Sequence, residues 1–286
     1  MSVKNFISTL WAEKIDRALD EFLVFYDFCN HEYEGQLKKA GDTIRIQNVA
    51  RPTITTTTDG AEITLSGAET PDVTSVALQV KRQSYFDYGI YDVDKAQAAG
   101  DLDAALEHET TQGIANEIDI AIAGVAAEAQ AQKLFSTVPK VVSGTAGSGE
   151  INVLQALDEA QQKLYEANVP ANEAVEVIVS PRFYTLFRRD YAKLDTNNSE
   201  ILKNGKVGMY GNMTVKLSNN VATAASGAQD LIMVRTRKAI AAVKTLSKVE
   251  AYRPEARFAD AVKGLTVHDR KLVRPAELVV VNVKYA

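Results

Sequence analysis

Residues 41–85 read GDTIRIQNVARPTITTTTDGAEITLSGAETPDVTSVALQVKRQSY, and this stretch decides the architecture. Its first nine residues alternate polar side chains with Ile44 and Ile46, which is the pattern of a strand with one dry face. The partner predicted for this strand is 76–85, where large apolar residues again alternate with smaller or polar ones. The Thr-rich stretch between them has too few large apolar side chains for a core of its own. We therefore expect an extended β arm that lies on another surface, such as a second subunit.

Composition limits the function classes. The chain has 286 residues, enough for one large domain or two modest ones, and 46% of them are hydrophobic, as in ordinary globular proteins. A net charge of −5 argues against a general nucleic-acid binder, which needs clustered Lys and Arg. The single Cys29 cannot form an internal disulfide, so a reducing cytoplasm suits the chain. No apolar run approaches the roughly 20 residues of a spanning helix, so no membrane is expected.

The N-terminal residues 6–29 carry apolar side chains at helical spacing. Acids and bases interrupt them, which excludes a signal peptide and favours an amphipathic cytosolic segment. Two placements fit the pattern equally: a helix docked on its own domain, or an arm that crosses to a neighbouring subunit.

Residues 101–133 contain the longest helical pattern, with small and apolar residues at i, i+3 and i+4 spacing. A helix over the whole range would be about 50 Å long at about 1.5 Å per residue. Small residues let other elements approach closely, so this helix is predicted to act as a spine. Gly113 and Gly124 are positions at which it could bend, or at which a neighbour could pack closely.

Helices and strands alternate in the second half of the chain. A helical pattern begins at INVLQAL and ends before Pro170, and VEVIVS at 175–180 predicts a buried strand. Ser180 is a suitable N-cap for the next helix, with Pro181 in its first turn. These elements predict a compact α/β unit over about 150–235. The closing stretches LIMVRT, AIAAVKTLSKVEAYR, GLTVHDRKLV and ELVVVNVKY have strand-like composition, and we expect them to return to the long helix as a second layer.

The motifs of enzyme chemistry are missing from the sequence. GTAGSG at 144–149 lacks the Lys and Ser or Thr that grip phosphate and magnesium, and GKVGMYGN at 205–212 is better explained as a turn. The three histidines have no short spacing for a metal, and the apolar context of Cys29 does not favour a low thiol pKa. We therefore predict no catalytic, cofactor-binding or metal-binding residue and no cofactor. A hydrolase is retained only as a minor alternative.

Several segments, in order, resemble the major capsid proteins of tailed bacteriophages with the Hong Kong 97-type fold. FISTLWAEKI, LVFYDFCNHEYEG and GDTIRI resemble the opening of that family, and DVDKAQAAGDLDAALEHE resembles its long helix. VIVSPRFYTLF, GKVGMYGNMTVKLSNNV and the run from VEAYRPEARF to ELVVV resemble its later segments. The similarity covers nearly the whole chain, and the order of the segments carries it.

The resemblance implies an α+β capsid fold in four parts. They are an N-terminal arm at 1–40, an extended loop at 41–85, a peripheral domain at 86–135 with 237–286, and an axial domain at 136–236. It also implies self-assembly through hexamers and pentamers into an icosahedral shell, the virion capsid, built in the host cytoplasm. Implied partners are further copies of the chain, separate scaffolding and portal proteins, decoration proteins in some members, and packaged double-stranded DNA without sequence-specific contacts.

Two departures from the family pattern narrow this expectation. Some members weld the shell through a lysine of the extended loop, but no lysine occurs here between Lys39 and Lys81. Cross-linking by that route is not expected. The arm motif begins at Phe6 without a long preceding scaffolding segment, which implies a separate scaffold. The alternative within this fold is an encapsulin-like bacterial compartment that encloses cargo enzymes.

Opposite charges divide between the loop and the closing strands. We predict that acidic loop residues lie over a basic region of an adjacent subunit and steer assembly, although solvated loop charges explain the pattern equally well. The predicted inter-subunit contacts are Asp59, Glu62, Glu69, Asp72, Arg253, Arg257 and Arg270.

Overall fold

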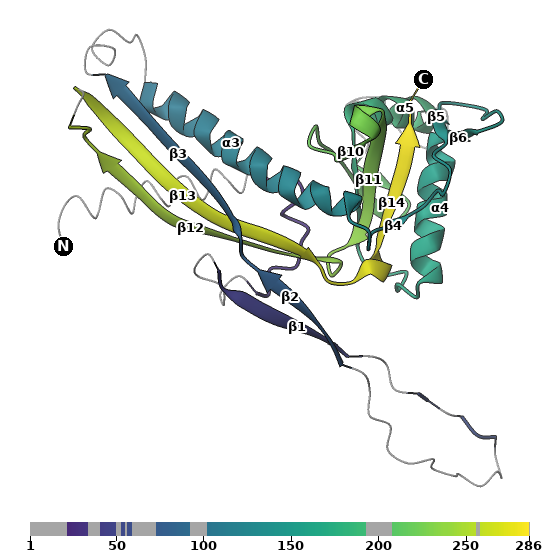
Figure 1. Ribbon diagram of the computed structural model, residues 1–286. Coiled ribbons are helices and arrows are strands. Elements are labelled where there is room, and N and C mark those ends of the chain that lie inside the picture. Colours follow the sequence, from purple (N-terminus) through teal and green to yellow (C-terminus); the bar gives the residue numbers. More distant parts are fainter. Residues whose placement is uncertain are drawn as a thin grey trace.

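A computed structural model describes residues 22–33, 41–49, 53–54, 56–58, 73–91, 102–192, 208–255 and 258–285. There are two bodies of β-structure: a three-stranded sheet that lies along one long helix, and a nine-stranded sheet at the C-terminal end of that helix (Figure 1). A two-stranded ribbon projects below them (Figure 1).

The ribbon consists of β1 (Thr43–Val49) and β2 (Val73–Gln79), paired antiparallel from Thr43 opposite Gln79 to Val49 opposite Val73. The expected alternation is confirmed, because Ile46 and Leu78 are buried while their polar neighbours are exposed. The partner strand is shorter than the predicted 76–85. It ends at Gln79, since the chain then leaves the ribbon and begins to pair with a different sheet.

That second sheet has three antiparallel strands in the order β12-β13-β3, namely β12 (Ile240–Tyr252), β13 (Ala259–Leu272) and β3 (Arg82–Tyr91). The long helix α3 (Leu102–Ala123) lies along it (Figure 1). Buried side chains Ile114, Ile118 and Ile122 form the apolar stripe of this helix. The sheet takes strands from both ends of the sequence, as the long-helix layer was predicted to do.

The helix is shorter than the predicted 101–133. It has 22 residues, gives way to a 3-10 turn, η2, at Gly124–Ala127, and is followed by strand β4 (Gln132–Lys133). The helical pattern continues in sequence, but Gln132 and Lys133 pair with the C-terminal strand instead. A tertiary strand pairing therefore replaces the last predicted turns.

The larger sheet has nine strands, with the main path β6-β5-β14-β11-β7-β9-β8; β10 pairs with β11, and β4 with β14. Its further strands are β5 (Lys140–Val142), β6 (Glu150–Asn152), β7 (Val175–Val179), β8 (Met209–Tyr210), β9 (Met213–Leu217), β10 (Thr223–Ala224), β11 (Gln229–Thr236) and β14 (Leu278–Lys284). Short 3-10 turns, η3 (Ala225–Gly227) and η4 (Pro275–Glu277), precede β11 and β14.

Two helices flank this sheet, α4 (Val153–Glu166) and α5 (Pro181–Tyr191) (Figure 1). The predicted cap is confirmed: Ser180 Oγ accepts the N–H of Phe183, and Pro181 occupies the first turn. The predicted strand β7 is buried at all five positions. Gly211, with φ of 58°, forms the tight turn between β8 and β9, as expected of the described part of GKVGMYGN.

The last strand, β14, lies apart from the long helix with which the sequence analysis grouped it. Residues 237–286 were assigned together with the long helix, yet β14 pairs with β11, β5 and β4 in the nine-stranded sheet. Its first six positions are all buried and include four valines, at 279–281 and 283, which suits a central strand that is covered on both faces. β14 is therefore a strand of the nine-stranded sheet, whereas β12 and β13 belong to the sheet along α3.

Candidate assembly surfaces

The predicted loop acids Asp59, Glu62, Glu69 and Asp72 lie outside the described residues, as does Arg257. Arg253 is described and its side chain is 55% exposed, with Nη1 3.8 Å from Asp260 Oδ1. Nearby, Lys263 Nζ is 3.2 Å from Glu250 Oε2 and lies over the ring of Tyr252. Exposed basic groups therefore do lie on this sheet, each beside an acid of its own subunit.

Arg270 is placed differently. Its side chain is 16% exposed and points to the long helix, where Nε donates to the carbonyl oxygen of Ala121 at 2.6 Å. Nη2 lies 3.4 Å from Glu128 Oε1. Burial lowers the pKa of this guanidinium from its ordinary value, and the positive charge of Arg82 adds to the effect. Arg270 is thus occupied by contacts within the subunit.

The base of the three-stranded sheet is covered by the ribbon. Ile46, Leu78 and Val80 pack with Val243 and Val267 in one apolar cluster. The opposite, exposed face of the ribbon carries polar and small residues. The ribbon is therefore held to the sheet through its apolar face.

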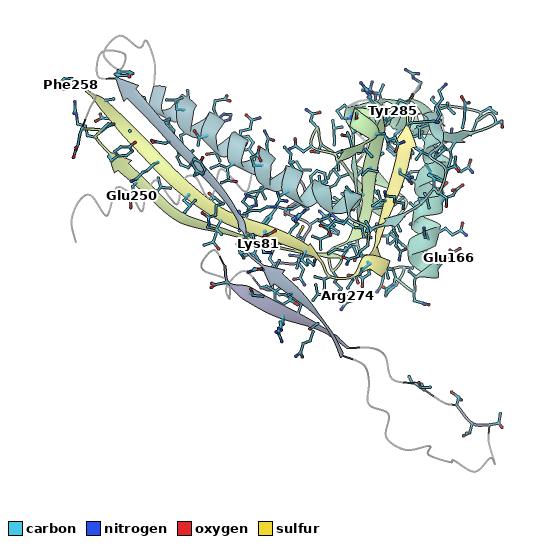
Figure 2. The ribbon with its side chains drawn as sticks, viewed as in Figure 1. Lys81, Glu166, Glu250, Phe258, Arg274 and Tyr285 are labelled. Atoms are coloured by element: carbon cyan, nitrogen blue, oxygen red, sulfur yellow. The ribbon has the colours of Figure 1, made fainter. Side chains whose placement is uncertain are left out.

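Two aromatic side chains of the same sheet are uncovered in the described structure. Phe258, directly before β13 at the end away from the ribbon, is 82% exposed, and Tyr85, on β3 opposite Leu265, is 83% exposed; Figure 2 shows Phe258 at the end of the sheet away from Lys81. A groove of about 450 Å³ lies beside Tyr85, lined by Tyr85, Phe86, Asp87, Glu250, Lys263, Gly264 and Leu265. Exposed aromatic side chains beside a groove are typical of surfaces that contact another protein.

Residues 22–33, here called the N-terminal strap, dock on their own subunit. Leu23, Phe25 and Cys29 are buried in the main core, and Asn30 forms a parallel bridge with Ala241 of β12. This favours the own-domain placement for these residues, while 6–21 lie outside the described residues.

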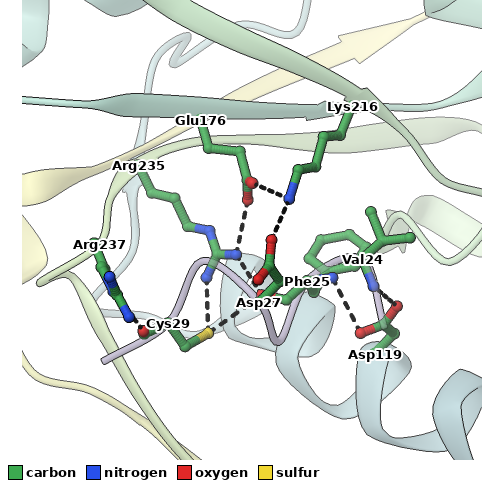
Figure 3. Close-up of polar contacts among 9 residues, drawn as sticks. All are labelled: Val24, Phe25, Asp27, Cys29, Asp119, Glu176, Lys216, Arg235 and Arg237. Atoms are coloured by element: carbon green, nitrogen blue, oxygen red, sulfur yellow. Dashed lines mark hydrogen bonds and ion pairs between the residues drawn. The ribbon is translucent and has the colours of Figure 1, made fainter. Parts of the chain in front are cut away.

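A buried polar cluster holds the strap to the nine-stranded sheet (Figure 3). Arg235, fully buried on β11, donates through Nη2 to Phe25 O at 2.5 Å and to Glu176 Oε1 at 3.0 Å, and through Nη1 to Cys29 Sγ at 3.1 Å. Lys216 Nζ lies 2.9 Å from both Glu176 Oε2 and Asp27 Oδ2. Each buried charge has a partner of opposite sign, as burial requires.

The long helix holds the same strap from its other side. Asp119 Oδ2 accepts the N–H of Val24 at 2.9 Å, and Oδ1 accepts the N–H of Phe25 at 3.1 Å (Figure 3). Burial raises the pKa of this carboxyl to about 6, and the strap N–H groups partly oppose the shift. Burial also raises the pKa of the Cys29 thiol, which agrees with the inert thiol expected from its apolar context.

Sequence reasoning missed this cluster, although a signal was present. VEVIV and LIMVRT each place one charged residue, Glu176 and Arg235, inside a buried apolar strand. Two opposite charges in two buried strands predict that the strands are neighbours and that the charges pair.

The glycine-rich loop considered above as a phosphate-binding motif is held by hydrogen bonds within the protein. In the loop GTAGSG, the N–H of Gly144 donates to Asp190 Oδ2 at 2.7 Å and that of Gly147 to Glu150 Oε2 at 3.1 Å. These amides already bind carboxylates of the protein. In the described ranges, no group of three or more His, Cys, Asp or Glu residues is placed to hold a metal. None of the helices there has the length and apolarity that crossing a bilayer requires.

A long helix along a three-stranded sheet, a projecting ribbon and a second, nine-stranded body together form the α+β architecture of phage capsid proteins, and the resemblance seen in the sequence is confirmed. A structure from Mycobacterium phage Che8 is 26% identical, with a TM-score of 0.68, over 91% of this chain and 90% of that one. The capsid of Cyanophage P-SCSP1u (15% identity, TM-score 0.67) matches 92% of this chain and 88% of its own. The mature capsid of bacteriophage PhiM1 (17% identity, TM-score 0.61) matches 92% of this chain and 87% of its own.

Neither a scan against protein families nor a search of curated proteins finds a match. By its fold, the chain is a capsid-type shell protein. The structures to which it is similar are those of shell proteins, which are structural and not enzymatic.

Proposed function

We propose that this chain is the major capsid protein of a tailed bacteriophage and self-assembles through hexamers and pentamers into an icosahedral head around double-stranded DNA. The observation that carries the proposal is the match to phage structures over about nine-tenths of both chains, 26% identical in one case. An elongated subunit with a ribbon that leaves the body also suits a protein that makes contacts with several neighbours. Closure of a shell adds many modest contacts, so stability does not require a covalent weld.

The proposed partners are further copies of this chain, with separate scaffolding and portal proteins during assembly in the host cytoplasm. Within the shell, the loop 41–85 would reach over an adjacent subunit. Its acids would meet the exposed Arg253 and Lys263, whereas Arg270 is committed to the long helix. The encapsulin-like compartment is less favoured, because the structures most similar to this chain are mostly phage capsids.

Negative-stain electron microscopy tests the proposal directly. The protein is expressed alone and with its gene neighbours, and closed shells or six-fold rings are the expected result. Shells only in co-expression would identify a required scaffold. A persistent monomer in both conditions would contradict the proposal, and a shell that encloses a co-expressed cargo enzyme would support the compartment instead.

A further inference from the structure

The ribbon leaves the three-stranded sheet at Lys81, between β2 and β3 (Figure 2). The backbone N–H of Lys81 donates to Asp269 Oδ2 at 2.9 Å. Pairing of β3 with β13 begins only at the next residue, Arg82, opposite His268. Asp269 therefore takes a backbone N–H that would otherwise lose its strand partner. One carboxylate thus ties the base of the ribbon to the edge of β13.

The next residue of β13 holds the end of the long helix. Arg270 binds the carbonyl oxygen of Ala121, in the last turn of α3, and its Nη2 approaches Glu128, directly after η2. One guanidinium therefore spans the change from α-helix to 3-10 turn. Gly124 lies at this change, and a Cβ built on it would be 3.7 Å from Nη2, so the guanidinium lies against the helix backbone.

Asp269 and Arg270 also bind each other. The backbone N–H of Arg270 donates to Asp269 Oδ1 at 2.9 Å, and Nη1 lies 3.7 Å from the same oxygen. The two side chains are 9% and 16% exposed. At this burial neither charge can leave its partner without a large desolvation penalty, so the pair keeps its geometry.

We propose that Asp269 and Arg270 form a coupling unit that links the angle of the ribbon to the end of the long helix. Displacement of Lys81 shifts Asp269, and Asp269 shifts the guanidinium that bridges Ala121 and Glu128. Such coupling travels through bonded, packed neighbours, and its free energy is reciprocal, so a change at the helix end also biases the position of the ribbon. The unit lies within one subunit and acts whatever that subunit assembles into.

Two substitutions with readouts on opposite sides test the coupling. Asp269→Asn keeps the shape but leaves one acceptor oxygen for two N–H donors. The Asp269→Asn variant should show faster amide hydrogen exchange at residues 121–128. The described contacts of the Asp269 side chain are with Lys81 and Arg270, so an effect at 121–128 must pass through Arg270. Arg270→Lys keeps the charge but cannot bind Ala121 and Glu128 together in the same geometry. It should shift or broaden the distance between spin labels on the ribbon and the sheet.

The labels are placed at Ser75→Cys and Ala251→Cys, both exposed, and the labelled protein is diluted with unlabelled protein. Cys29 is fully buried, which confines labelling to the introduced cysteines. Arg274→Ala is the matched control, because Arg274 forms an exposed pair with Glu277 and should move neither readout. If Arg270→Lys fails to fold, Glu128→Gln weakens the same contact from the helix side. The proposal would be overturned if each substitution acted on its own side alone. In that case Asp269→Asn would change only the spin-label distance, and Arg270→Lys or Glu128→Gln would change only the amide exchange at 121–128.

Discussion

At the scale of single residues, Asp119 performs a function normally given to a local cap. Its two carboxylate oxygens accept consecutive N–H groups of a strap almost a hundred residues away in sequence. Strap residues Val24 and Phe25 thereby obtain partners that their own segment does not supply. The cost is a carboxylate at 1% exposure, whose pKa rises to about 6.

Asp119→Asn should change both the stability and its pH dependence. In the native state the carboxyl of Asp119 has a pKa of about 6, whereas the ordinary pKa of an aspartate is 3.8. Between these values the native state holds more protons than the unfolded state, so this group makes stability fall as pH rises. The contribution between pH 5 and pH 7 is about 1 kcal/mol. Urea unfolding of the unassembled protein at pH 5, 6 and 7 should show that asparagine removes this fall and is more damaging at pH 5. Parallel profiles would refute the assignment.

His268 should affect the pH dependence of stability in the opposite direction from Asp119. It is buried, lies 2.9 Å through Nε2 from Ser84 Oγ, and has a pKa lowered to about 4, chiefly by burial. Between pH 6.5 and about pH 4, the unfolded state binds a proton at this residue and the native state does not. The free energy of unfolding therefore falls as pH falls, by up to about 3 kcal/mol. His268→Gln keeps a bond to Ser84 and cannot ionise. Its urea midpoint should decline less from pH 7 to pH 4.5 than that of the native protein, and an equal decline would exclude this role.

At the scale of elements, the ribbon shows how a pair of strands too small for a core of its own becomes part of the fold. Two antiparallel strands alone are marginal in water. Here one apolar face packs on the base of the three-stranded sheet, and backbone bonds of Val80 with Gly41 and Asp42 close the ribbon at its root.

Leu78→Ala should therefore loosen the ribbon and leave most of the body intact. Leu78 is 1% exposed within the cluster that joins the ribbon to the sheet, and removal of its side chain should cost about 2–4 kcal/mol there. Amide exchange at 43–49 and 73–79 should accelerate much more than exchange in β11 and β14. The exposed neighbour Gln79→Ala is the control. Uniform acceleration through both sheets would show that the ribbon does not open independently.

At the scale of the whole molecule, contacts available to a neighbour lie towards the extremities. The exposed side chain of Phe258 lies at the end of the three-stranded sheet away from the ribbon, and the ribbon points away from both bodies (Figure 1). A shell subunit needs such dispersed contacts, because each one must engage a different neighbour.

Charge reversal in the loop tests the electrostatic part of the proposed assembly. Glu62→Lys combined with Glu69→Lys should slow shell formation and reduce its dependence on salt, because steering by opposite charges is screened by ions. Light scattering at two salt concentrations measures both effects. Glu117→Lys combined with Glu166→Lys, at two exposed helix positions, provides a control with the same change in net charge. Unchanged kinetics in the double variant would mean that the loop acids are simply solvated.

The sequence by itself determined the local elements and the class of protein. Alternation predicted β1 and the apolar face of β2, helical periodicity predicted α4, and Ser180 with Pro181 predicted the start of α5, because these signals depend on neighbours a few residues apart. The order of these elements was sufficient for the resemblance to capsid proteins.

Only the tertiary structure decided which distant elements meet. The placement of β14 in the nine-stranded sheet, the early end of α3 and the inward contact of Arg270 all depend on partners far away in the chain. Arg270 shows the reason. A basic residue in a strand has the same local pattern whether it faces solvent or a helix carbonyl, and the packing of α3 on β13 selects between them.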